Sequence, residues 1–167
     1  MNKQFPNYIK YILSNIGFLF VYLFFFRLIF FFFIANFESV SIEEIQTAFS
    51  YGIRFDLKLV ILSYFPLSLL ILSTNYLFFK KKVFRKIAIT YHILLYLLLT
   101  IVYLIDIGYY NYLFTRLDAS SLRFLSNLKI SSQLVVETYP VYKGLFALIF
   151  LFVFIRFISI KLFDKIA

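Results

Sequence analysis

The sequence predicts an all-α membrane protein: a polytopic helical bundle with four transmembrane helices and short interfacial helices on the extracytoplasmic side. First, 63% of the 167 residues are apolar and only 15% are charged, with a mean hydropathy of +0.90, whereas soluble domains are about 45–50% apolar and about 25% charged. Second, the sequence has four apolar runs that are long enough to supply the roughly 20 residues that cross a hydrocarbon core about 30 Å thick. Third, the basic residues lie beside these runs and form no separate basic face.

The first two spans follow a cytoplasmic N-terminal stretch, residues 1–11. The run at 12–35 is longer than the core of about 7–15 residues found in signal peptides and lacks an A-x-A cleavage site, so we expect it to be retained. The run at 57–79 contains Pro66, which removes one helical hydrogen bond and is expected to bend the helix.

The third and fourth spans complete a transmembrane domain that covers residues 12–163. The third is expected at 87–107 and the fourth at 141–160, with Pro140 placed for a first helical turn. Residues 164–167 are then a short tail.

Orientation is predicted by the stretch KKKVFRK, Lys80–Lys86, which has five positive charges in seven residues. Short loops rich in Lys and Arg face the cytoplasm. Both termini are then cytoplasmic. The loop before the second span, with Glu38, Glu43 and Glu44, and the segment 108–140 are external.

The external segment is half polar, as YNYLFTRLDASSLRFLSN at 110–127 illustrates. Asp118 can cap an amphipathic helix, and Ser131 or Ser132 can cap a second short helix that ends near Tyr139. We expect both to lie in the membrane interface. The alternative is an amphipathic connector that binds no ligand.

Arg27 lies within the first span, about eight residues or roughly 12 Å from its outer end. An arginine at such a depth costs about 2.5 kcal/mol or more on insertion scales, and it therefore indicates a functional site. The alternative is structural: the side chain extends to the interface or pairs with a neighbouring helix. Asp56 and Asp106 are the candidate partners at the same predicted level.

Two clusters of external charge predict a site for a lipid headgroup. The motif YGIRFDLK places Arg54, Asp56 and Lys58 within five residues, with Arg54 and Asp56 as the headgroup candidates. The next external segment contributes Arg116, Asp118 and Arg123. Guanidinium groups bind phosphate oxygens in pairs, and a carboxylate can orient the arginine or accept from a headgroup hydroxyl. An anionic membrane phospholipid is the predicted partner. The alternative is that these charges only set topology and helix packing.

Other chemistry is not indicated. The chain has no cysteine, a single histidine, His92, and no spacing typical of a metal site or a catalytic constellation. We therefore assign no catalytic residue, no metal ligand and no cofactor. Nucleic acid is excluded as a partner because membrane topology explains the basic residues.

Three segments carry a resemblance to a known family. YGIRFDLKLVILSYFPLSLLIL, IDIGYYNYLFTRLDASSLRFLSN and ETYPVYKG resemble parts of the bacterial membrane sulfatase-like phosphoglycerol transferases, the lipoteichoic acid synthase family. In that family five membrane helices precede a large extracytoplasmic domain of the alkaline phosphatase superfamily. This domain has a threonine nucleophile and a divalent metal, usually manganese. It transfers phosphoglycerol or a related group from a phospholipid such as phosphatidylglycerol to an external glycan or polymer.

The resemblance implies a protein of the bacterial cytoplasmic (inner) membrane with its N-terminus in the cytoplasm. Four crossings leave residues 164–167 in the cytoplasm, so we expect the chain to stop before a fifth helix. The family's catalytic and metal residues have no counterpart here. We expect a fragment that is inactive alone, whose partners are an anionic phospholipid and the missing catalytic domain, which would hold the metal.

The predicted function is thus to anchor such a transferase and to orient its lipid substrate. The alternative is a non-catalytic membrane protein that acts as an interaction partner or passive anchor. A small transporter has Arg27 in its favour, but the sequence lacks an inverted repeat and paired broken helices.

Overall fold

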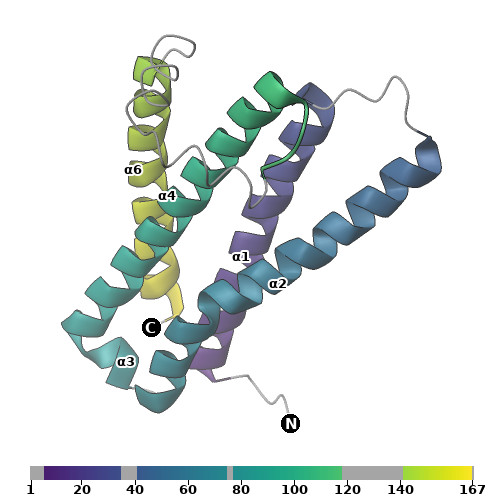
Figure 1. Cartoon of the computed structure of the whole chain (residues 1–167). Coiled ribbons are helices and arrows are strands. Elements are labelled where there is room, and N and C mark those ends of the chain that lie inside the picture. Colours follow the sequence, from purple (N-terminus) through teal and green to yellow (C-terminus); the bar gives the residue numbers. More distant parts are fainter. Residues whose placement is uncertain (1–5, 35–40, 75–76, 118–140, 167) are drawn as a thin grey trace, which may run out of the picture. The chain divides into compact units, whose positions relative to one another are not determined.

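The computed structural model describes residues 6–34, 41–74, 77–117 and 141–166. Every regular element in these residues is a helix, which confirms the all-α prediction. The elements are α1 (Asn7–Ile29), the π-helix η1 (Phe30–Ile34), α2 (Ile42–Thr74), α3 (Leu77–Lys80), α4 (Lys82–Leu113) and α6 (Val141–Ile166), as Figure 1 shows.

Four of these helices are long and apolar enough to cross a membrane: Asn7–Phe32, Ile42–Thr74, Lys82–Asn111 and Gly144–Ile166. Helices suit a bilayer because each satisfies its own backbone hydrogen bonds where no water is present. The chain is therefore a multi-pass membrane protein, as predicted. The short interfacial helices expected after Asp118 lie outside the described residues.

The start of α2 differs from the prediction, because Glu43 and Glu44 belong to its first turn and not to a loop. The Oγ of Ser41 accepts from the N–H of Glu44 at 3.3 Å, and the Glu44 carboxylate accepts from the N–H of Ser41 at 3.0 Å. This reciprocal pair is a capping box. At about 1.5 Å per residue, the 33 residues of α2 extend about 50 Å, well beyond the hydrocarbon thickness of about 30 Å.

The end of α4 is a sharp turn. Phe114 follows the last helical residue with φ 57°, and its N–H donates to the Tyr110 carbonyl at 2.8 Å. A left-handed residue in this position ends many helices, but it is usually glycine because a Cβ is strained there. The turn therefore redirects the chain at once after Leu113.

Each long helix buries a stripe of side chains at intervals of about four residues. In α1 the stripe is Tyr11, Asn15, Leu19 and Leu23; in α2 it is Gly52, Asp56, Val60, Tyr64, Leu67 and Ile71. Such rows form the ridges by which helices pack. The helices α1 and α2 pack against each other, and Arg27 lies one further step along the α1 stripe.

By its contacts the chain divides into two compact units, Met1–Tyr91 with Ser159–Ala167, and His92–Ile158. The first unit contains an aromatic cluster in which the Tyr11 ring contacts Phe78, Phe79 and Phe163. It also contains an exposed ion pair between Arg85 and Asp164 at 2.7 Å. The candidate site lies in this unit, at the opposite end of α2 from α3.

Candidate functional site

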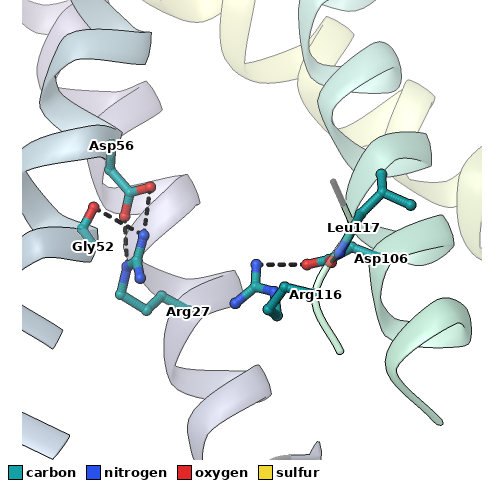
Figure 2. A network of polar contacts seen from close by, with 6 residues as sticks. All are labelled: Arg27, Gly52, Asp56, Asp106, Arg116 and Leu117. Atoms are coloured by element: carbon teal, nitrogen blue, oxygen red, sulfur yellow. Dashed lines mark hydrogen bonds and ion pairs between the residues drawn. The ribbon is translucent and has the colours of Figure 1, made fainter. Parts of the chain in front are cut away.

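Arg27 and Asp56 form a two-pronged ion pair between α1 and α2 (Figure 2). The Nε of Arg27 donates to Asp56 Oδ2 at 2.7 Å, and one terminal nitrogen donates to Asp56 Oδ1 at 2.8 Å. The same nitrogen donates to the carbonyl of Gly52 at 2.9 Å. The side chains of Arg27 and Asp56 are 19% and 5% exposed. The structure thus pairs Arg27 with one of its two predicted partners.

Gly52 makes room for this ion pair. A Cβ at this position would lie 1.8 Å from Arg27 Nη1 and 2.3 Å from Cζ, so any larger residue requires the guanidinium to move. Because the carbonyl of Gly52 also accepts from Arg27, the glycine provides both the space and an acceptor. We call Arg27, Gly52 and Asp56 the α1–α2 clamp.

Arg54, only two residues from Asp56, lies on the exposed side of α2. Its guanidinium carbon lies 5.8 Å from the centre of the Tyr51 ring, so the side chain extends back toward the N-terminus of α2. There it borders a small pocket of about 320 Å³, which we call the polar pocket. Its lining consists of Gln46, Thr47, Ser50, Tyr51 and Arg54.

A second hollow adjoins the polar pocket and runs between α2 and the end of α1. This apolar groove has a volume of about 520 Å³ and shares Gln46, Ser50 and Arg54 with the polar pocket. Its remaining lining is apolar: Leu28, Phe31, Phe32, Ile45, Phe49 and Ile53. The Phe49 ring contacts Phe24 and Phe31 at centroid distances of 6.0 and 5.9 Å, which holds this part of α2 against α1 and η1.

In the second unit, Asp106 binds the chain that follows α4 (Figure 2). Its Oδ2 lies 2.5 Å from Arg116 Nη2, and its Oδ1 accepts from the N–H of Leu117 at 2.8 Å. The Asp106 side chain is 7% exposed and that of Arg116 is 51% exposed. The turn at Phe114 brings residues 116 and 117 back to this carboxylate.

The predicted headgroup residues therefore have different surroundings. Asp56 is buried in the clamp and Arg116 is paired with Asp106, while Arg54 borders both the polar pocket and the apolar groove. Asp118 and Arg123 lie outside the described residues. The headgroup role of all five stays a prediction.

Sequence reasoning missed the polar residues beside Arg54. Gln46, Ser50 and Arg54 recur at intervals of four, which places them on one face of a helix. That pattern became visible only once residues 42–56 were known to be helical. The capping box at Ser41 and Glu44 was the signal that could have revealed the helix.

Comparisons of the chain with protein-family models, curated proteins and solved structures find no match.

Proposed function

We propose that this chain is a membrane domain that binds the headgroup of an anionic phospholipid and orients it for a phosphoglycerol-type transferase acting outside the cytoplasmic membrane of a bacterium. The proposal of a transferase in a bacterial membrane rests on the resemblance of YGIRFDLK and the later segments to the lipoteichoic acid synthase family. The lipid-binding part rests on the polar pocket.

One observation carries the lipid-binding proposal: the guanidinium of Arg54 borders a pocket whose other polar groups are hydroxyls and an amide. A guanidinium binds phosphate oxygens through two parallel hydrogen bonds. The Gln46 amide and the Thr47 and Ser50 hydroxyls are suited to the remaining oxygens and to a glycerol hydroxyl. The volume of about 320 Å³ is at the small end for ligand sites, which suits a headgroup better than a whole lipid.

The structure changes the role that we propose for Asp56. Its carboxylate faces Arg27 and is almost fully buried, so it is placed to hold α1 against α2 and not to accept from a headgroup. Because Arg27 and Asp56 neutralise each other, the positive charge of Arg54 two residues away stays available for a phosphate. The clamp then acts by positioning Arg54.

The lipid-binding proposal is tested by native mass spectrometry of the purified chain, released from mixed micelles of phosphatidylglycerol and phosphatidylcholine. We expect preferential retention of phosphatidylglycerol, and we expect Arg54→Ala to reduce that preference about tenfold, the size of one charge-assisted hydrogen bond. Lys58→Ala is the matched control, since Lys58 is an exposed cation one turn away that borders neither hollow. Equal losses in both variants would contradict a specific role of Arg54.

The transferase part has its own test. The test uses a protein in which the segments quoted above precede a sulfatase-type domain. In a protein that carries this domain, Arg54→Ala should lower turnover of the lipid substrate and spare a soluble phosphodiester. Equal loss on both substrates would exclude a role in lipid orientation and favour the alternative of a passive anchor.

A further inference from the structure

We propose that the apolar groove between α2 and the end of α1 binds one acyl chain of the phospholipid whose headgroup occupies the polar pocket. This inference rests on the proposed function and extends it from a headgroup to an intact lipid. The recognised ligand is then a membrane phospholipid, and a free glycerol phosphate would satisfy only half of the site.

The two hollows adjoin each other and differ in polarity, as the two parts of a phospholipid do. They share Gln46, Ser50 and Arg54, so one boundary separates a polar wall from an apolar one. On the apolar side, Leu28, Phe31 and Phe32 of α1 and η1 face Phe49 and Ile53 of α2. A lipid has the same sequence of groups, from phosphate through glycerol esters to hydrocarbon.

The direction of the Arg54 side chain fits this arrangement. The guanidinium lies back over Tyr51, toward the N-terminus of α2, and the groove residues Ile45 and Phe49 lie along the same part of the helix. A phosphate at Arg54 would therefore lie beside the groove, on the same stretch of α2 as Phe49 and Ile53.

Charge and composition favour a lipid chain over a peptide as the occupant. A peptide segment would bring backbone N–H and C=O groups against a wall of phenylalanine, leucine and isoleucine side chains, and each unsatisfied group costs several kcal/mol in an apolar setting. An acyl chain has no such groups. The cation at the groove's edge selects among lipids for those with an anionic headgroup.

The wall contributed by α1 is irregular at this point. The groove residues Phe31 and Phe32 belong to the π-helix η1, and the α-helical pattern of α1 ends at Ile29. Short π-helical turns are found disproportionately at functional sites. The irregular turn therefore coincides with the groove and supports its use as a binding surface.

The experiment uses the fact that the chain has no tryptophan. Phe49→Trp and, as an independent second probe, Phe31→Trp place a single fluorophore in the groove. Phe55→Trp is the matched control, because Phe55 lies on the same helix, is 66% exposed and does not line the groove. Each variant is reconstituted in phosphatidylcholine vesicles that contain a minor fraction of phosphatidylglycerol with brominated acyl chains, and quenching is measured.

We expect the groove tryptophans to be quenched as if brominated phosphatidylglycerol were enriched about tenfold over its share of the bilayer. The control should be quenched in proportion to that share. Adding Arg54→Ala should return the groove tryptophans to the control value. If neither groove tryptophan is quenched more than Phe55→Trp, the acyl-chain site is overturned.

The outcomes separate this inference from the proposed function. Excess quenching in the groove by brominated phosphatidylglycerol and brominated phosphatidylcholine alike supports the acyl-chain site and contradicts selection of an anionic headgroup. Arg54-dependent retention of phosphatidylglycerol in mass spectrometry without excess quenching supports the headgroup site and overturns the acyl-chain site.

Discussion

Arg27 donates three hydrogen bonds to α2, two of them to the Asp56 carboxylate. The side chains of Arg27 and Asp56 are largely buried. Removing one member of a buried pair leaves the other charge unpaired, and this cost is larger than the net contribution of the pair itself. The clamp should therefore respond very differently to single and to double replacement.

We expect Asp56→Ala to lower the free energy of unfolding by about 3 kcal/mol, because Arg27 loses its carboxylate partner. The double replacement Arg27→Leu with Asp56→Leu should restore most of that loss. Unfolding by sodium dodecyl sulfate in mixed micelles measures both. The control is Arg85→Ala, since the Arg85–Asp164 pair is 43% and 53% exposed and should contribute about 0–1 kcal/mol. Equal costs for the two pairs would contradict a buried clamp.

Gly52 provides a second test of the α1–α2 clamp. Gly52→Ala should lower the free energy of unfolding by about 1–3 kcal/mol, because the new Cβ displaces the Arg27 guanidinium from its acceptors. In an Arg27→Ala background the same change should cost nothing. Gly17→Ala is the control within α1, where an added Cβ meets no atom within 4 Å. A loss that persists without Arg27 would mean that Gly52 serves helix packing alone.

The sequence pointed to Arg27 as an intramembrane charge and named Asp56 and Asp106 as its possible partners. It did not distinguish them, because both carboxylates were predicted at the same depth and the register of α1 against α2 depends on packing of the buried stripes. Arg54 was predicted as a headgroup-binding residue because of its charge. Its neighbours Gln46, Thr47 and Ser50 were missed because uncharged polar residues are unremarkable in a presumed loop.

Among the helices, α2 begins well before its hydrophobic run, and hydropathy alone does not reveal this early start. The apolar run that begins near Leu57 predicted a span, yet the helix starts at Ile42 and its first part carries the polar pocket. A capping side chain satisfies an N–H group that the helix leaves open, so the helix can begin well before the hydrophobic run.

Ser41→Ala should loosen the first turn of α2. The N–H of Glu44 loses its acceptor, so its hydrogen exchange should become several-fold faster, while amides near Val60 stay unchanged. Ser41→Thr keeps the hydroxyl and should retain protection. Exchange measured by mass spectrometry in micelles resolves the two segments. Unchanged exchange at Glu44 in the alanine variant would show that the capping box does not stabilise this end of α2.

At the end of α4, one substitution is expected to stabilise the protein. Phe114→Gly should raise the free energy of unfolding by about 1 kcal/mol, because glycine adopts a φ of 57° without the strain of a Cβ. Phe114→Ala removes the ring but keeps the Cβ and should bring no such gain. Detergent unfolding of both variants separates the backbone effect from loss of the aromatic ring. A gain of the same size in the alanine variant would point to the ring.

At the scale of the whole molecule, the number of membrane-crossing helices was the most predictable property. Four apolar runs of sufficient length are visible in the sequence because the bilayer tolerates few charges over about 20 residues. The choice between Asp56 and Asp106 as the partner of Arg27 was not predictable, and neither were the two hollows, since both depend on which faces of the helices meet. Two of the predicted headgroup residues, Asp118 and Arg123, lie outside the described residues.

We expect the polar pocket to face the compartment opposite to the lysine-rich loop, where it meets the outer leaflet. Since the chain has no cysteine, single cysteines at Thr47 in the pocket and Lys81 in the loop report each side without background. With a membrane-impermeant thiol reagent on intact cells, Thr47→Cys should react directly and Lys81→Cys only after permeabilisation. Reaction of both from the same side would contradict the orientation and, with it, the proposed outer-leaflet lipid site.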